Sequence, residues 1–181
     1  MERRGKSSRL FIQIFFFLFL FWIVLQFLAP LSLPRGSIDD LSGLTAISDN
    51  EELFSKLPIP CNAVYSIGDR LCHQKAERSF FINDNQMPFC SRCTAIWLGL
   101  AIGLGVMVFY RFQLNEKFLF IVIAGVAPIG IDGIGQLFGF WESTNVIRVI
   151  TGLLIGIVCG IAIGLIIDEF RDLAELHNNC G

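Results

Sequence analysis

Four residues with metal-binding side chains lie close together in the sequence: Cys72, His73, Cys90 and Cys93. Cys90 and Cys93 belong to a Cys-Ser-Arg-Cys motif, and this spacing lets one turn of chain direct two thiolates at the same ion. A third cysteine and a histidine would complete the tetrahedral sulfur and nitrogen set that zinc prefers. The sequence therefore predicts a metal site, with zinc as the expected ion. Because Cys72 and His73 are adjacent, both can bind one ion only from a turn; otherwise three cysteines bind it with water or an outside ligand.

The same cysteines permit a second interpretation, in which they are oxidised. Thiols outside the cytoplasmic membrane tend to form disulfides, and Cys61, Cys72, Cys90 and Cys93 could form two. A Cys-x-x-Cys pair at the start of a helix is also typical of thiol exchange, since the helix N-terminus stabilises a thiolate. Metal site, structural disulfides and redox-active pair all stay open at this point.

A second polar set lies in two apolar segments nearer the C-terminus, with members spaced three or four residues apart on helix faces. These residues are Asp132, Gln136, Asn145, Arg148 and Thr151. A charge within a membrane span costs at least about 2.5 to 3.5 kcal/mol, so Asp132 and Arg148 are expected to face the protein interior and to pair with each other. The set either pins two helices together or lines a polar pocket that opens outward.

The elements that must position these residues are membrane helices. Of the 181 residues, 54% are hydrophobic and 17% are charged, against about 25% charged in soluble domains. Apolar runs over residues 10–29, 94–110, 118–138 and 146–167 match the roughly 20 residues that cross the hydrocarbon core as a helix. We expect an all-α integral membrane protein, a bundle of four transmembrane helices with one long extracytoplasmic loop. That loop comprises a tether, residues 30–60, and the Cys/His segment, with short helices over residues 49–56 and 63–71.

The distribution of basic residues predicts the orientation. The first segment, residues 1–9, contains Arg3, Arg4, Lys6 and Arg9, and the loop between the second and third spans contains Arg111 and Lys117. The positive-inside rule places both in the cytoplasm, together with a C-terminal tail over residues 168–181. The protein is thus expected in the cell membrane as a multi-pass protein with both termini cytoplasmic. The net charge of −2, without a basic stripe, argues against a nucleic-acid partner.

Glycines recur at helical spacing in two of the expected spans. They are Gly99 and Gly103 in the second span and Gly152, Gly156, Gly160 and Gly164 in the fourth. In lipid, such small faces let helix backbones approach closely. The glycines are expected to pack helices within one chain, with a homo-oligomer through the same faces as the alternative.

Several short motifs together resemble a known family. They are Cys72-His73-Gln74, Arg78-Ser79-Phe80-Phe81, Pro88 to Thr94, Asp132-Gly133 with Gln136, Glu142-Ser143 with Asn145, and Arg148 with Thr151-Gly152. Over residues 61–164 the chain resembles the small archaeal and bacterial membrane proteins called domain of unknown function 2085. Family members usually have Gly-Ile-Tyr after the threonine of the Cys-x-x-Cys motif, where this chain has Ala95-Ile96-Trp97. The resemblance implies a multi-pass membrane protein with a shared site at these positions, and implies no activity.

Three hypotheses for the function follow. In the first, the Cys72, His73, Cys90 and Cys93 metal centre lies above the pocket of Asp132, Gln136, Arg148 and Thr151. A zinc-activated water would then act on a lipid-borne or extracytoplasmic substrate, with Asp132 or His73 as base. In the second, Cys90 and Cys93 pass electrons from exported thiols to a membrane quinone. In the third, the protein is an oligomeric transporter or scaffold subunit without enzymatic activity.

Overall fold

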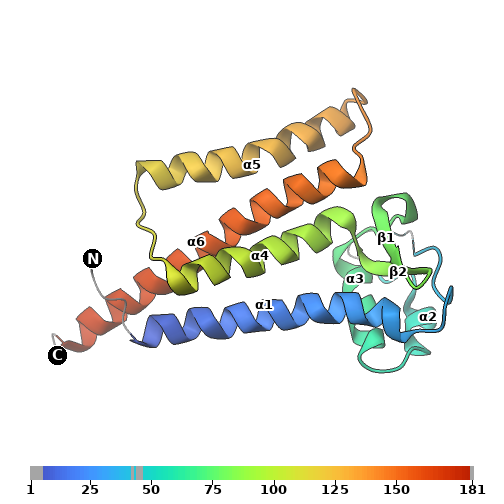
Figure 1. Ribbon diagram of the computed structural model, residues 1–181, viewed down its shortest axis with the longest axis horizontal. Helices are drawn as coiled ribbons and strands as arrows, with labels where there is room; N and C mark the ends of the chain where they lie inside the picture. Colours follow the sequence, from blue (N-terminus) through green and yellow to red (C-terminus); the bar gives the residue numbers. More distant parts are fainter. Residues whose placement is uncertain (1–5, 42, 44–46, 180–181) are drawn as a thin grey trace.

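Four long helices dominate the computed structural model, which describes residues 6–41, 43 and 47–179 (Figure 1). They are α1 (Lys6–Ser32), α4 (Ser91–Phe109), α5 (Glu116–Leu137) and α6 (Asn145–Asn179). Each is long and apolar enough to cross a membrane, which confirms the prediction of four spans within the described chain. The predicted basic residues Arg3 and Arg4, and the thiol of Cys180, lie outside the described residues.

Two helix boundaries differ from the prediction in ways that matter for the site. Helix α4 begins at Ser91 instead of Thr94, so Cys93 belongs to its first turn. Helix α6 continues to Asn179, so most of the expected separate tail at residues 168–181 is helical. Hydropathy misses both extensions because polar residues can continue a helix beyond the apolar part of a span.

The long helices lie side by side in the order α5, α6, α4, α1 (Figure 1). Glycines bring α4 and α6 into backbone contact: a Cβ atom added at Gly99 would lie 2.6 Å from the carbonyl oxygen of Leu153 and 2.8 Å from the Cα of Gly156. Gly103 faces Gly160 in the same way. The glycine face of α6 is therefore filled by α4 of the same chain, as the packing interpretation predicted, and it is not a free surface for a second copy.

A small subdomain gathers at the end of the bundle where α1 ends and α4 begins (Figure 1). It contains α2 (Glu51–Ser55), α3 (Cys61–Leu71), the 3-10 turn η1 (Ala76–Arg78), and strands β1 (Ser79–Ile82) and β2 (Asn85–Cys90). The short helices at residues 49–56 and 63–71 were predicted, although α2 is shorter and α3 begins at Cys61. The subdomain has a core of its own, formed by Ala29, Leu33, Ile38, Leu41, Phe54, Cys61, Val64 and Tyr65.

The segment expected to be a tether is folded instead. Its residues Ile38 and Leu41 are buried, and their amides donate to the side chains of Asn85 and Gln86 at 3.0 and 3.1 Å. Proline and glycine in the segment suggested a flexible connection, but its apolar residues are spaced widely enough to enter the subdomain core one at a time. The tether prediction was therefore wrong for the described part of residues 30–60.

A β-hairpin, which the all-α prediction did not include, leads into α4. Strands β1 and β2 are antiparallel and are joined by Asn83 and Asp84, both with φ of 56°. Two consecutive left-handed residues are typical of a type I′ turn, which matches the twist of a hairpin and favours asparagine and aspartate. The hairpin matters for the site because β2 runs directly into the Cys-x-x-Cys motif.

Candidate metal centre and its polar surroundings

Three sulfur atoms form a compact group at the junction of the subdomain and the bundle. The Sγ atoms of Cys72, Cys90 and Cys93, the cysteine cluster, all lie within 4.8 Å of one another. A tetrahedral zinc ion with metal–sulfur bonds of about 2.3 Å requires sulfur separations of about 3.8 Å, so small side-chain adjustments would suffice. Cys72 and Cys90 are buried, and Cys93 is partly buried. The cysteine cluster could hold a metal ion.

The three cysteines of the cluster come from three different parts of the fold. Cys72 is the C-terminal cap of α3, with extended backbone, Cys90 ends β2 and caps the N-terminus of α4, and Cys93 lies in the first turn of α4. The antiparallel register places Ser79 of β1 opposite Cys90. Helix, hairpin and membrane helix must therefore all be folded before the three sulfurs meet.

Gln74 fixes the approach of the Cys72 segment to β2. It is fully buried in the left-handed region (φ 41°), and its Nε2 donates to the carbonyl oxygen of Pro88 at 2.7 Å. Its own carbonyl oxygen accepts from Nε2 of Gln86 at 2.5 Å. Gly68 leaves room for this contact, because a Cβ atom at that position would lie 2.8 Å from the side-chain Nε2 of Gln74. The sequence analysis did not predict this role. The glutamines of the Cys-His-Gln and Asn-Gln-Met segments were the only signal for it, and their burial is visible only in the structure.

The environment of the cysteine cluster favours thiolate at Cys90. Hydrogen bonding from the Cys72 thiol, and next from Cys93, lowers the pKa of Cys90, while the contact with Cys90 is the main cause of a raised pKa at Cys72. The backbone N–H of Cys90 also donates to the Cys72 sulfur at 3.4 Å. Amides at a helix start carry partial positive charge, so the N-terminus of α4 adds to the stabilisation of negative sulfur.

His73 lies beside the cysteine cluster but is not a member of the compact group. Its Nδ1 is 3.9 Å from Sγ of Cys72, and the sulfurs that lie mutually within 4.8 Å are those of the three cysteines. Burial is the main cause of a lowered pKa of His73. A neutral imidazole is the form that binds metal. The proximity is consistent with the predicted ligand role, which stays a prediction.

Asp132 is the centre of a second network, and its partner is not the predicted one. The buried carboxylate forms an ion pair with Arg92, and it accepts from Nε2 of Gln136 at 2.9 Å and from Nε1 of Trp141 at 3.2 Å. Arg148 instead donates to Oδ1 of Asn145 at 3.2 Å within its own helix. The predicted pairing of Asp132 with Arg148 was wrong because Arg92, brought over by the first turn of α4, reaches the carboxylate.

The two middle residues of the Cys-Ser-Arg-Cys motif connect the cysteine cluster to the polar set. Ser91 donates through Oγ to Oδ1 of Asn145 at 3.0 Å, and this oxygen also accepts from Arg148. Arg92 reaches Asp132 on α5. One turn of chain thus contains two cysteines of the cluster. The two residues between these cysteines contact the neighbouring helices, since Ser91 contacts α6 and Arg92 contacts α5. These bonds connect the cysteine cluster to the polar set, and the joint functional site stays a prediction.

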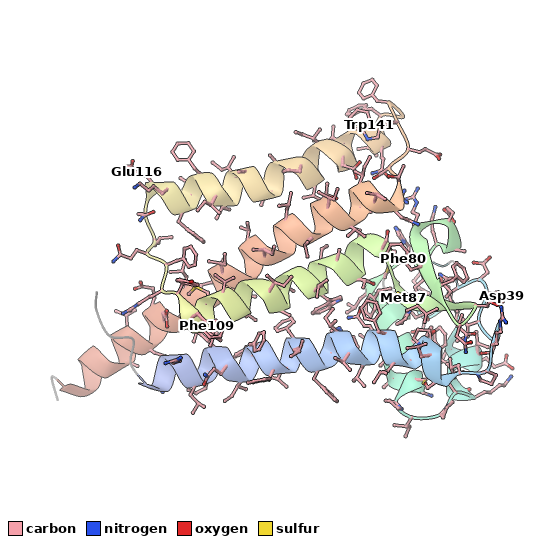
Figure 2. The ribbon with its side chains drawn as sticks, in the orientation of Figure 1. Asp39, Phe80, Met87, Phe109, Glu116 and Trp141 are labelled. Atoms are coloured by element: carbon pink, nitrogen blue, oxygen red, sulfur yellow. The ribbon has the colours of Figure 1, made fainter. Side chains whose placement is uncertain are left out.

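Figure 2 shows at which end of the bundle Trp141 lies. Trp141, beyond the end of α5, lies at the same end as Phe80 and Met87 of the hairpin, while Phe109 and Glu116 lie at the opposite end. Trp141 was not predicted as a site residue; its position directly after a span was the only signal available.

The cavity near Asp132 is less polar than the predicted pocket. It has a volume of about 380 Å³ and is lined by Pro128, Ile131, Asp132, Trp141, Ile147 and Thr151. Gln136 and Arg148 do not belong to this lining. Thr151 donates its hydroxyl to the carbonyl oxygen of Ile147 at 2.9 Å, so its polar group serves its own helix. The predicted pocket of four polar residues is therefore replaced by a mainly apolar cavity with one carboxylate at its edge.

The part of the chain that matches a known protein family contains this site. Residues 72–166 match the family described as predicted membrane protein (domain of unknown function 2085), over more than half of the chain. The chain belongs to this family. The matched region begins at Cys72 and includes the whole cysteine cluster and both polar networks. The resemblance found in the sequence is confirmed.

Two archaeal proteins with the name uncharacterized protein are similar to this chain. One, from Methanocaldococcus jannaschii, is 33% identical over 114 residues, covering 61% of this chain and 70% of the relative. Another, from Methanothermobacter thermautotrophicus, is 40% identical over 91 residues, covering 48% of this chain and 78% of the relative. No solved structure matches the chain.

Proposed function

We propose that this protein is a zinc-binding membrane protein whose metal centre fastens the extracytoplasmic subdomain to the helix bundle. Cys72, Cys90 and Cys93 supply three thiolates, and His73 supplies the fourth ligand. The observation that carries the proposal is the approach of three sulfurs, from three separate elements, to within 4.8 Å of one another. Three thiolates and an imidazole form a closed set typical of structural zinc.

The number of sulfurs favours metal over disulfides. A disulfide uses two of the three cluster sulfurs and leaves one, whereas a metal ion uses all three. Cys61 does not supply the missing partner, because it belongs to the subdomain core and its Sγ lies 3.1 Å from Oγ of Ser32. Two disulfides among the four loop cysteines would therefore require a different packing of α3.

The hydrogen bonding of Asp132 favours a structural role over catalysis at this carboxylate. Oδ2 is engaged by Arg92 and Gln136, and Oδ1 accepts from Trp141. A general base needs an oxygen that can take a proton from substrate or water. We therefore assign Asp132 to holding Arg92, and through it the Cys-x-x-Cys turn, against α5. Activation of a water by the metal would need His73 to leave the fourth position open.

The proposed orientation follows from the positive-inside rule. The start of α1, which contains Arg9, and the start of α5, which contains Lys117, lie at the bundle end far from the subdomain (Figure 1). Basic residues of short loops remain in the cytoplasm. The metal centre then faces the outside of the cell membrane, and both termini are cytoplasmic.

The decisive experiment measures metal per chain by inductively coupled plasma mass spectrometry on detergent-purified protein. We expect about one zinc per chain in the wild type and loss of that zinc in the Cys90→Ser, Cys93→Ser double variant. The matched control is Cys61→Ser, Cys159→Ser, which removes two thiols outside the cysteine cluster and should keep the metal. If the cluster variant does not fold, cobalt loaded into the wild type supplies the answer through its thiolate charge-transfer absorption.

Absence of metal from the wild type, together with a Cys90–Cys93 disulfide that forms and breaks with redox conditions, would overturn the proposal. That result would favour thiol–disulfide exchange, and quinone reduction by the oxidised and reduced protein would be the next assay.

A further inference from the structure

Three arginines from three elements converge beside the cysteine cluster. Arg78 comes from η1, Arg92 from the first turn of α4 and Arg148 from the first turn of α6. Arg78 directly precedes Ser79, which the hairpin register places opposite Cys90, and Arg148 shares Oδ1 of Asn145 with Ser91, the residue after Cys90. Arg92 follows Ser91 and pairs with Asp132. Positive charge is thus concentrated at one point of the bundle end.

The carboxylates nearby do not balance these cations. Asp132 is engaged by Arg92. Arg78 lies 3.7 Å from the carboxylate of Glu77, whose side chain is 67% exposed, and such exposed pairs contribute little. Arg148 is buried, and its hydrogen bond goes to the neutral amide of Asn145. Among the described residues, no carboxylate lies within ion-pair distance of Arg148.

Burial makes this imbalance energetically significant. A buried charge without an opposite charge is strongly unfavourable, more so within a membrane span. Nε of Arg92 is also buried without a hydrogen-bond partner in the described structure, and Nε of Arg78, which is 3.7 Å from Oε1 of Glu77, is too far from it for a hydrogen bond. Guanidinium N–H groups in such positions normally find an acceptor. These unused donors and the buried Arg148 charge indicate a missing anion.

Two helix starts increase the positive potential. Helices α4 and α6 both begin at this end, and neither has an acidic residue in its first turn. The N-terminus of a helix carries a partial positive charge, so Arg148 occupies a position where a cation is unfavourable by itself. An anion bound there would be stabilised by both the guanidinium groups and the helix starts.

The metal centre does not remove the excess. Three thiolates around a divalent ion have a net charge of one negative unit, which can offset one arginine at most. Without metal, a single thiolate in the cysteine cluster likewise offsets one arginine at most. The need for an anion therefore holds whether or not the cysteine cluster binds zinc.

We propose that Arg78 and Arg148 bind a phosphate group at the membrane surface. Guanidinium groups recognise phosphate oxygens through paired, charge-assisted hydrogen bonds. The site lies where α4 and α6 emerge at the end of the bundle, the level at which phospholipid headgroups are found. The phosphate comes from a lipid headgroup or from a free phosphate compound, and both present the same oxygens to the arginines.

The test compares variants for phosphate binding while their metal content is recorded in the same samples. Arg78→Gln is the main variant because Arg78 lies outside the membrane spans, and Arg148→Gln and Arg148→Lys extend the comparison. Arg35→Gln is the matched control, since Arg35 is an exposed arginine of the same subdomain, 2.5 Å from Asp84. Native mass spectrometry counts bound phospholipid, and thermal melting is followed with inorganic phosphate against chloride at equal ionic strength.

For a lipid headgroup, we expect about one phospholipid per chain to survive detergent exchange in the wild type and Arg35→Gln and to be lost in Arg78→Gln. For a free compound, inorganic phosphate should raise the melting temperature beyond chloride, with half-saturation shifted at least tenfold in Arg78→Gln, which corresponds to about 1.4 kcal/mol. Zinc content should be the same in wild type and Arg78→Gln. If the wild type shows neither effect, or Arg78→Gln behaves as Arg35→Gln, the phosphate site is wrong. Loss of zinc in Arg78→Gln would also contradict the phosphate role, because Arg78 would then support the metal centre, whereas absence of zinc from the wild type would count against the metal centre alone.

Discussion

One carboxylate holds three parts of the molecule together at the site. Asp132 receives Arg92 from α4, Gln136 from its own helix and Trp141 from the connection to α6. A buried ion pair adds little over an apolar contact, but removing one partner leaves an uncompensated charge. Asp132 is thus best understood as the residue that makes Arg92 tolerable inside the bundle.

Asp132→Asn should therefore lower the free energy of unfolding by about 3 kcal/mol, the lower end for a broken buried pair, since the Arg92 side chain is 23% exposed. Circular dichroism during a titration from mild detergent into sodium dodecyl sulfate measures this quantity. Asp84→Asn, which removes an exposed partner of Arg35, should cost less than about 1 kcal/mol. Adding Arg92→Gln to Asp132→Asn should recover part of the loss. Equal effects for the two aspartate variants would contradict the role given to Asp132.

The sequence was informative about which residues matter and less so about which of them meet. The Cys-x-x-Cys spacing and the nearby Cys72 predicted the cysteine cluster, and the cost of intramembrane charge predicted that Asp132 and Arg148 are buried. The pairing of Asp132 with Arg92 could not be predicted, because it depends on how far α4 is displaced along α5 and α6. Residue spacing within one helix carries no information about register between helices.

At the scale of the elements, glycine decides how closely α4 and α6 approach. Gly99→Ala would place a Cβ 2.6 Å from the carbonyl oxygen of Leu153, so the helices must separate. We expect a loss of about 1 to 3 kcal/mol in the same unfolding titration, the usual cost of overpacking. Gly133→Ala is the matched control, since a Cβ at Gly133 of α5 meets no atom within 4 Å and alanine favours helix. A loss at Gly133 as large as at Gly99 would argue against the α4–α6 contact.

Hydropathy predicted the long helices because a membrane span is defined by length and apolar content alone. The hairpin was not predictable in the same way. Strand β2 is buried on both faces and contains Asn85 and Gln86, so it shows neither alternation nor a continuous apolar run. Oδ1 of Asn85 accepts from the amides of Ser37 and Ile38 at 2.8 and 3.0 Å, and its Nδ2 donates to the carbonyl oxygens of Pro30, near the end of α1, and Pro34. Such partners, distant in sequence, make a polar strand stable inside the subdomain.

In the whole molecule, the two ends of the helix bundle differ: one end is extended by α6, and the other carries the subdomain and the arginines. Helix α6 has 35 residues, about 52 Å at 1.5 Å per residue, against a hydrocarbon core of about 30 Å. It therefore extends beyond the bilayer, and Asp168 and Arg171 lie towards its C-terminal end. The opposite end carries the subdomain, the cysteine cluster and the arginines. The proposed metal and phosphate sites thus belong to one membrane surface, and the orientation decides which compartment supplies their ligands.

Labelling of single introduced cysteines tests that orientation directly. Arg35→Cys lies in the subdomain, with a side chain 77% exposed, and Leu114→Cys lies in the α4–α5 connection, with 77% exposure of the residue. Cys180→Ser in both variants removes the thiol near the C-terminus, and Cys180→Ser alone gives the background. A membrane-impermeant maleimide should label Arg35→Cys in intact cells and Leu114→Cys only after permeabilisation, because basic loops stay in the cytoplasm. The reverse pattern would place the cysteine cluster in the cytoplasm, where reducing conditions keep thiols available for metal without competition from disulfides.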